Sequence, residues 1–412
     1  MIGLRLTTRV QTCLVVLLLA AASVGASPRV KVGADVLLER RLDLLQNKRI
    51  GLVTNHTGRT SAGEFLVDAL IRRGIRVTTI FGPEHGIRGE AGAGDEVKDA
   101  VDERTGLTVY SLYGAVRKPT PAMLKNVDLL LYDIQDVGAR FYTYISTMGL
   151  CMEAAAEQGI EFVVLDRPNP LGGLQTEGPV LPDSLRSFVG AFPVPVVYGL
   201  TIGELATLVN EQGWLAQKSK ARLTVVPIDG WTRKMRWRDT GLPWVPPSPN
   251  IRTPEAALIY PGTCFLEATN LSEGRGTDAP FQIIGGPFLR RDGLASALAQ
   301  SGIKGMTFRD TSFTPVSSKF EGQLCHGVVI QVQDPDLFNP LLFGLTLLEV
   351  LYARAPEYLS VNMRSLSRRL GDSGAYDLIA KGTPVTTVAE RWNEPLARFK
   401  SVARKYWRYP EQ

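Results

Sequence analysis

The first half of the chain alternates short apolar runs with helix-forming segments, and this alternation constrains the fold more than any other feature. Runs typical of buried strands occupy residues 49–54, 75–81, 107–112, 127–132, 161–165 and 223–228. Helix signals lie between them: capping boxes open at Ser61 and at Thr201, and a helical pattern covers residues 143–158. Strand and helix alternation at this spacing predicts an α/β fold with a Rossmann-like, mainly parallel sheet flanked by helices.

The second half has a different pattern. The proline-rich stretch 243–250 predicts a boundary between a Rossmann-like domain over residues 27–250 and a smaller α+β domain over residues 251–412 that completes a cleft. In this second domain we expect a helix capped by Thr253, a glycine-rich loop over 271–287, strands at 307–316 and 326–333, and a helix over 338–354. An apolar stripe from Val388 to Tyr406 predicts one C-terminal helix, kinked at Pro395.

Residues 1–26 have the pattern of a signal peptide. Arg5 and Arg9 precede an apolar run over residues 13–22, and small residues at 24 and 26 suit a signal peptidase. The run is too short to span a bilayer. We therefore expect an exported protein, periplasmic or secreted, that begins at Ser27 and has no stable membrane insertion. The cysteines at 151, 264 and 325 allow either one disulfide with a free thiol or three buried, unpaired thiols.

Composition and motifs exclude several classes of protein. A chain with 44% hydrophobic residues, 21% charged residues and 4 cysteines is neither disordered nor a disulfide scaffold. The net charge is only +5 and the basic residues are dispersed, which argues against nucleic acid as a ligand. Serine-hydrolase elbows, P-loops and dinucleotide fingerprints in their proper context are missing from the sequence. The 3 histidines form no metal-ligand spacing, so we expect neither a metal nor a cofactor.

Polar residues gather directly after four of the predicted strands. In a parallel sheet the carboxyl ends of the strands share one edge, so these loops are expected to form one cleft. Glu84 follows the second strand in a turn rich in proline and glycine, where a carboxyl group can serve as a general acid.

A second carboxylate would complete the usual arrangement of a glycoside hydrolase. The candidates for it are Asp133, Asp136, Asp166, Glu177, Glu267 and Glu273. Each of these could instead cap a helix or pair with an arginine. The aromatic residues Tyr132, Phe141, Tyr142 and Tyr144 fit either a sugar-stacking platform or a packed core.

Five strings carry a resemblance to a known family. They are GLVTNHTG at 51–58, FGPEHGIRG at 81–89, DIQDVGARFY at 133–142, DRPNP at 166–170 and NLSEGRGT at 270–277. In these strings the chain resembles the exo-β-N-acetylmuramidase family, NamZ, from about residue 30 to the C-terminus. The resemblance implies a secreted glycosidase of peptidoglycan recycling that releases N-acetylmuramic acid from the non-reducing end of peptidoglycan-derived glycan fragments. It also implies a Rossmann-like catalytic domain, a smaller C-terminal domain and a cleft between them.

For that activity we expect Glu84 to be the acid/base and Glu177 to be the second catalytic carboxylate. The 2-acetamido group of the substrate could itself act as the nucleophile, in which case one protein acid is enough. Arg88 and Arg140, in the two most polar loops, are expected to hold the lactyl carboxylate of muramic acid. Further substrate-binding residues are expected to be Asn55, His56, His85, Asp133, Gln135, Tyr142, Asn270, Glu273 and Arg275.

Two other functions fit the sequence. One is an exported glycan-binding protein without activity, and the other is an amidase or esterase of the cell wall. A binding protein has no need for a glutamate in a tight turn at a strand end, and an amidase normally shows a metal set or an activated nucleophile. Nothing in the sequence indicates an oligomeric state.

Overall fold

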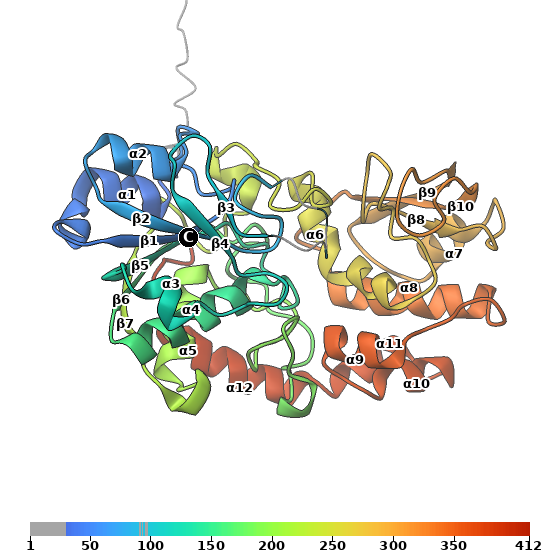
Figure 1. Ribbon diagram of the computed structural model, residues 1–412. Helices are drawn as coiled ribbons and strands as arrows, with labels where there is room; N and C mark the ends of the chain where they lie inside the picture. Colours follow the sequence, from blue (N-terminus) through green and yellow to red (C-terminus); the bar gives the residue numbers. More distant parts are fainter. Residues whose placement is uncertain (1–29, 90–91, 93, 95–97) are drawn as a thin grey trace, which may run out of the picture.

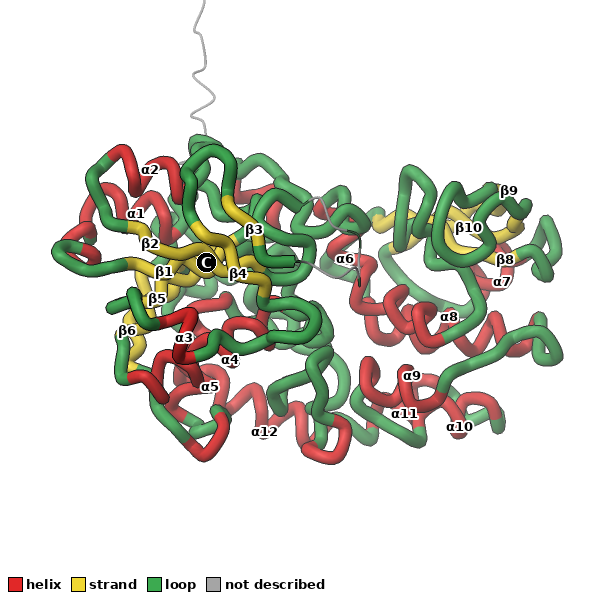
Figure 2. Tube along the Cα trace, viewed as in Figure 1, coloured by secondary structure: helices red, strands yellow, loops and turns green. Residues whose placement is uncertain are grey.

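The computed structural model describes residues 30–89, 92, 94 and 98–412. The signal peptide expected at 1–26 lies outside the described residues. Two sheets lie at opposite ends of the molecule, each with its own helices (Figures 1 and 2). Within the described residues, no helix combines the length and the apolar composition that crossing a membrane requires.

The larger sheet has seven strands in the order β3-β4-β2-β1-β5-β6-β7. Its parallel strands are β1 (Ile50–Thr54), β2 (Val77–Gly82), β4 (Thr108–Ser111), β5 (Leu129–Asp133), β6 (Glu161–Leu165) and β7 (Arg222–Val226). The short β3 (Ala100–Val101) adds an antiparallel edge. Strand order reverses around β1, which pairs with β2 on one side and β5 on the other. The predicted α/β fold class is confirmed.

Helices cover both faces of this sheet (Figure 1). One face carries α1 (Gly33–Arg40) and α2 (Leu66–Arg72), and the other carries α3 (Pro121–Leu124), α4 (Tyr144–Gln158) and α5 (Ile202–Glu211). Side chains of β5 alternate between the two layers: Leu129 and Leu131 join the core under α1 and α2, while Leu130 and Tyr132 join the core under α4 and α5. This explains why the strands read as continuous apolar runs.

One of the two predicted capping boxes is present. The Thr201 hydroxyl accepts a hydrogen bond from the Glu204 amide and the Glu204 carboxylate accepts one from the Thr201 amide, so α5 begins as expected. The capping box predicted at Ser61 is wrong, because α2 begins only at Leu66. The Ser61 amide instead donates to the Asp35 carboxylate, in a turn that precedes the helix.

The second unit is built on a three-stranded antiparallel sheet with the order β8-β10-β9. Its elements are α6 (Pro254–Thr263), β8 (Ile283–Gly286), α7 (Leu294–Gln300), β9 (Met306–Phe313), β10 (Cys325–Val332), α8 (Pro340–Arg354), α9 (Met363–Leu370), α10 (Ala375–Ala380) and α11 (Val385–Glu390).

Short 3-10 helices occur in both units. They are η1 (Leu42–Leu45), η2 (Asp183–Leu185), η3 (Ala216–Lys218), η4 (Trp237–Thr240), η5 (Cys264–Ala268) and η6 (Arg404–Tyr406). Thr253 caps α6 as predicted.

Strand β8 was not predicted, since its two glycines interrupt the apolar pattern. Helices α6 and α8 pack closely where Gly262 faces Gly344. A Cβ atom on Gly262 would lie 2.3 Å from the Pro340 carbonyl oxygen, so only glycine fits there.

The predicted single C-terminal helix is wrong. The chain forms α11 and then α12 (Asn393–Ala403), with the break at Trp392. Pro395 lies in the first turn of α12, where its missing N–H has no intrahelical partner to lose.

Residues after α12 return to the parallel sheet. The Tyr409 hydroxyl donates to the Asp166 carboxylate, and the Arg233 amide donates to the Pro410 carbonyl at 2.9 Å. The end of the chain thus ties the second unit back to the first. The domain boundary at residues 250 and 251 stays a prediction.

Candidate active site

A pocket of about 620 Å³ lies at the junction of the two units. The parallel-sheet unit supplies the loops after β2, β4 and β5, and the other unit supplies η5, the 273–281 loop, the 318–319 turn and α9. The pocket is therefore at the switch point of the sheet, where α/β folds usually bind their ligands. The charged residues among its described lining are Glu84, Arg117, Glu267, Glu273, Arg275, Lys319, Arg368 and Arg369.

Glu84 lies in a tight turn directly after β2. The Gly86 amide donates to the Pro83 carbonyl at 3.0 Å and closes the turn. His85 has a φ of 72°, a left-handed conformation that is uncommon outside glycine and often found at functional sites. The backbone thus aims the Glu84 side chain into the pocket, as the sequence predicted.

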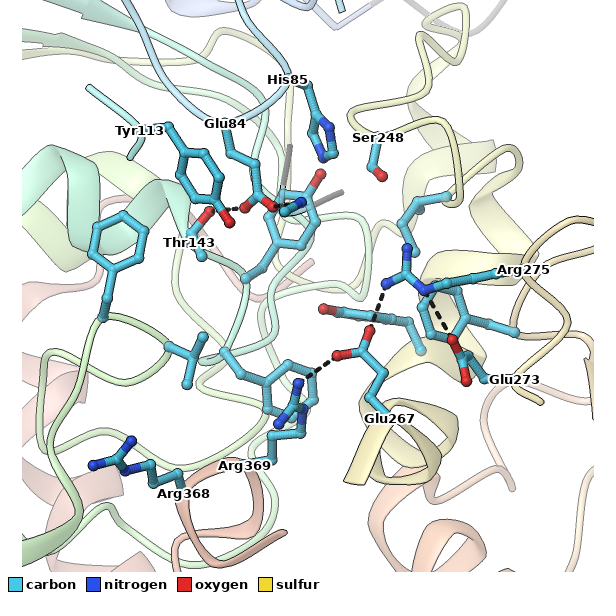
Figure 3. A pocket seen from close by; sticks show the side chains of 18 of the residues that line it. Glu84, His85, Tyr113, Thr143, Ser248, Glu267, Glu273, Arg275, Arg368 and Arg369 are labelled. Carbon is cyan, nitrogen blue, oxygen red and sulfur yellow. Dashed lines mark hydrogen bonds and ion pairs between the residues drawn. The ribbon is translucent and has the colours of Figure 1, made fainter. Parts of the chain in front are cut away.

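Neutral donors hold the Glu84 carboxylate (Figure 3). The Thr143 hydroxyl donates to Oε2 at 2.7 Å, and the Gly94 amide donates to Oε1 at 3.1 Å. Burial, reinforced by the negative charge and hydrogen bonding of Glu84, raises the pKa of Tyr113 to about 12. Hydroxyl groups can donate to a carboxylate or accept from a carboxylic acid, so this environment suits both protonation states of Glu84.

The opposite wall carries a network of ion pairs. Glu267 lies 2.6 Å from Arg275 and 2.6 Å from Arg369, while Glu273 lies 3.0 Å from Arg275 and 3.0 Å from Lys319. Burial alone would raise the pKa of Glu267, but the two arginines outweigh it and hold that pKa below its usual value. Glu267 is therefore a fixed negative charge. The structure brings the predicted residues Glu273 and Arg275 to the pocket together with Glu267, which the sequence offered as a candidate for the second carboxylate.

Aromatic rings form the apolar part of the pocket. Phe141, Tyr142, Tyr260 and Phe281 line it, and their rings meet edge to face with centroids 4.8–6.0 Å apart. The expected platform is thus present only in part. Tyr132 and Tyr144 are fully buried and belong to the core behind the pocket.

Several predicted binding residues support the site from behind. The Asn55 amide donates to the Tyr144 hydroxyl at 2.9 Å, and the His56 ring lies 2.6 Å from the Pro246 carbonyl. Asp133 forms a buried ion pair with Arg167 at 2.7 Å. None of Asn55, His56 and Asp133 is among the described residues that line the pocket. They hold the loops that do.

Gln135 and Asn270 also lie outside the described lining of this pocket. The Gln135 amide donates to two backbone carbonyls at 2.8 Å, those of Asp136 and Pro168. Asn270 cross-links the Tyr358 carbonyl and the Ser360 amide. Their direct contact with substrate is therefore not supported by this geometry, and a role in loop structure explains both.

The expected arginine pair does not form the anion site. Arg140 is 0% exposed, and its guanidinium donates to the carbonyls of Pro179, Val194 and Arg369 at 2.7–2.9 Å. Burial also lowers the pKa of Arg140 to about 9. Arg88 pairs with Asp102 and is not among the described residues lining the pocket. This geometry supports neither arginine as the anion site, because Arg140 is enclosed by protein carbonyls and Arg88 is paired outside the described lining.

Glu177 lies in another cavity, of about 510 Å³, and not with Glu84. Its Oε1 accepts from the Gln175 amide at 2.6 Å, and a backbone hydrogen bond links it to Leu341 in the first turn of α8. Burial raises its pKa to about 7. The structure places Glu177 outside the pocket that holds Glu84, so this geometry does not support Glu177 as the second catalytic carboxylate.

Sequence reasoning missed several pocket residues. These are Tyr113, Arg117, Thr143, Lys319, Arg368 and Arg369. A signal for the last two existed: Asn362 caps α9 and Gly371 ends it, a common start and stop pattern. No local signal places α9 beside η5, since that contact joins segments about 100 residues apart.

The cysteines are the remaining side chains that could act as nucleophiles or form a disulfide. Within the described part of the chain, Cys151, Cys264 and Cys325 are all buried and free, the second of the two outcomes that the sequence allowed. Burial raises the pKa of the Cys325 thiol, and that of Cys264 to about 12, so neither resembles an activated nucleophile.

Known proteins match this chain along most of its length. The N-terminal model of the exo-β-N-acetylmuramidase NamZ family matches residues 50–255, and the C-terminal model of that family matches residues 258–409. The peptidoglycan β-N-acetylmuramidase NamZ of Bacillus subtilis (strain 168) is 47% identical over 384 residues, which cover 93% of this chain and 92% of the relative.

Solved structures agree with the sequence matches. Two crystal structures of DUF1343 family proteins from Bacteroides fragilis superpose with TM-scores of 0.85 and 0.78 at 36% and 32% identity. They cover 92% and 93% of this chain, and 99% of each structure is matched. With both of its halves matched by the family models and a relative this similar, the chain belongs to the exo-β-N-acetylmuramidase NamZ family.

Proposed function

We propose that this protein is an exo-acting β-N-acetylmuramidase that releases N-acetylmuramic acid from the non-reducing end of peptidoglycan fragments. The relative in B. subtilis is named for that class of activity. The observation that carries the proposal is the placement of Glu84, a carboxyl group held by a hydroxyl and an amide in a pocket between the two units.

Glu84 donates a proton to the leaving glycosidic oxygen. When Glu84 is protonated on Oε2, the Thr143 hydroxyl turns and accepts from it, while Oε1 keeps its bond from the Gly94 amide. After the bond breaks, the carboxylate regains the Thr143 hydroxyl as a donor. The same group then takes a proton from the incoming water, as an acid/base residue does in both directions of such a reaction.

Glu267 supplies the second negative charge. Breaking a glycosidic bond builds positive charge on the sugar ring, and a fixed carboxylate on the opposite wall stabilises that charge without reorganising. Arg275 and Arg369 keep Glu267 ionised and in place. The 2-acetamido group of muramic acid can serve as the nucleophile in the same pocket, which removes the need for a nucleophilic side chain.

A chromogenic N-acetylmuramic acid glycoside tests the activity directly. We expect the purified protein to release the chromophore, and to release free N-acetylmuramic acid from a disaccharide in which this sugar is at the non-reducing end. The isomeric disaccharide with N-acetylglucosamine at that end is the control and should stay intact. A glycan-binding protein would turn over neither substrate, and an amidase or esterase would release only the stem peptide or acyl groups.

We further propose that the protein is exported and that residues 1–26 are removed. The support is the charged, apolar and small-residue pattern of that segment, together with a substrate class found in the cell wall. N-terminal sequencing of the native protein should begin at Ser27. An intact Met1 on the native protein would contradict the proposal.

A further inference from the structure

The pocket has an excess of positive charge. Its described lining contains three carboxylates, at 84, 267 and 273, and five cationic side chains, at 117, 275, 319, 368 and 369, a formal balance of +2 (5 minus 3). A concave site with that balance attracts an anionic ligand. The five cations differ in whether the protein itself already uses them.

Three of the five already pair with carboxylates of the protein. Arg275 bridges both carboxylates of its wall, and Arg369 donates to Glu267 and to the Ser365 hydroxyl. The Lys319 ammonium donates to Glu273 and to two backbone carbonyls at 2.9–3.0 Å. A ligand carboxylate would have to displace these partners, so none of these three cations is a ready anion site.

Two cations remain, and they are not equivalent. Arg117 is exposed and stacks over the Phe188 ring, 4.4 Å from its centroid. Arg368 is half-buried, and within the described part of the chain its guanidinium has no hydrogen bond or ion pair. A half-buried guanidinium with free donors holds an anion better than an exposed one, because water and salt screen it less.

Helix α9 holds Arg368 rigidly at the pocket wall. The Asn362 side chain caps the helix by accepting from the Ser365 amide, and Leu366 and Leu370 are buried beneath it. The neighbouring Arg369 is bound to Glu267, and Figure 3 shows Arg368 beyond Arg369, with its guanidinium directed away from that carboxylate. The helix therefore fixes the backbone of Arg368 at the pocket wall, while its guanidinium stays available to a ligand.

We propose that Arg368 is the specificity-determining residue that binds the lactyl carboxylate of N-acetylmuramic acid. This inference rests on the proposed function. The lactyl ether distinguishes muramic acid from N-acetylglucosamine, and a guanidinium matches a carboxylate with two parallel hydrogen bonds. A stem peptide converts this carboxylate to an amide. Fragments freed of their peptide should therefore bind better than fragments that keep it.

The test compares inhibition constants of three sugars against hydrolysis of a chromogenic muramic acid glycoside. The sugars are N-acetylmuramic acid, its lactyl methylamide and N-acetylglucosamine. In Arg368→Ala we expect the constant for N-acetylmuramic acid to rise about ten- to a hundredfold, with the other two changing less than about twofold. Arg368→Lys keeps the positive charge but cannot make two parallel hydrogen bonds, so it should recover part of the lost affinity. Arg364→Ala, an exposed arginine one turn earlier on α9, is the matched control and should change nothing.

Other results would overturn the assignment. Equal losses for all three sugars in Arg368→Ala would show a structural role, and a selective loss in Arg117→Ala instead would move the site to that arginine. If Arg368→Ala weakened binding of a peptide-bearing sugar with a free terminal carboxylate, but not binding of N-acetylmuramic acid, Arg368 would bind the peptide instead. Calorimetric binding of the same sugars to wild type and variants keeps the test independent of turnover. If the wild-type protein bound N-acetylmuramic acid but hydrolysed no glycoside, the proposed function would be rejected while the role of Arg368 in binding could still be tested.

Discussion

The two walls of the pocket use the same type of residue in opposite ways. On the parallel-sheet wall, Glu84 is held by a hydroxyl and a backbone amide, with no arginine or lysine bonded to it among the described residues. On the other wall, Glu267 and Glu273 are each held by two cations. The first carboxyl group has neutral partners, whereas two arginines hold the pKa of Glu267 below its usual value and keep it charged.

The groups that contact each carboxylate explain this difference. A hydroxyl group serves a carboxylic acid and a carboxylate almost equally well, so it leaves the proton free to move. An arginine stabilises only the ionised form and strongly opposes protonation. One wall is thus suited to acid/base chemistry, and the other to a constant electrostatic field around the sugar.

Replacing the carboxyl group of Glu84 by an amide should have the largest effect on turnover. Glu84→Gln keeps the size of the side chain and still accepts from the Gly94 amide, but it cannot act as an acid. We expect turnover of a natural disaccharide to fall about 10²- to 10⁴-fold, with a smaller loss on a nitrophenyl glycoside, whose leaving group needs no proton. Steady-state kinetics on both substrates measure the difference.

His85→Gln is the matched control, since His85 is adjacent and also lines the pocket. Its loss should be much smaller and similar on both substrates. A folded Glu84→Gln protein with nearly normal turnover on the disaccharide would place the acid elsewhere and remove the contrast between the walls.

Neutralising Glu267 should cost stability, in addition to the transition-state stabilisation proposed for its charge. Glu267→Gln leaves Arg275 and Arg369 close together without the carboxylate they share, and Glu267 is only 19% exposed. We expect the free energy of unfolding to fall by about 3 kcal/mol. Glu84→Gln should lose far less, because its partners are neutral. Urea denaturation of the two variants compares the walls directly.

Glu39→Gln is the control for Glu267→Gln, because it breaks an exposed ion pair with Lys31. Its effect should stay within about 0.5 kcal/mol. If Glu267→Gln were as mild as this surface change, the ion pairs of the second wall would not be a structural unit.

Glu177 extends the comparison to a carboxyl group without a hydroxyl or a cation. Among the described residues its Oε2 has no hydrogen-bond partner, and burial raises its pKa from 4.5 to about 7. Between these values the folded state binds more protons than the unfolded state, so the free energy of unfolding falls as pH rises from 4.5 to 7. The shift corresponds to a loss of up to about 3 kcal/mol above pH 7.

Glu177→Gln removes this titration. We expect the variant to gain stability relative to wild type when the pH rises from 5 to 8, with little change at pH 5 and unaltered kinetics on the chromogenic glycoside. Thermal denaturation at a series of pH values measures it. Parallel curves for the two proteins would mean that Glu177 is solvated in the folded state, and a loss of activity would restore it as a catalytic candidate.

Much of the architecture was predictable from local pattern. The strands of the large sheet, the start of α5 at Thr201 and the position of Glu84 after a strand follow from apolar periodicity and turn chemistry, which act over a few residues. Two errors also had local causes. Two glycines interrupt the apolar pattern of β8, so this strand was not predicted. The apolar stripe continues across Trp392, so the break between α11 and α12 was not predicted.

The sequence by itself determined the α/β class, the strand-end loops and the turn that aims Glu84. Only the tertiary structure decided which of many charged residues face the pocket. Arg140 and Arg368 each lie within three residues of a glycine in the sequence, yet the guanidinium of Arg140 donates to three carbonyl groups and that of Arg368 has no such partner among the described residues. The physical reason is that a side chain's role depends on which groups already satisfy it, and those groups come from segments far apart in the chain, such as η5 and α9.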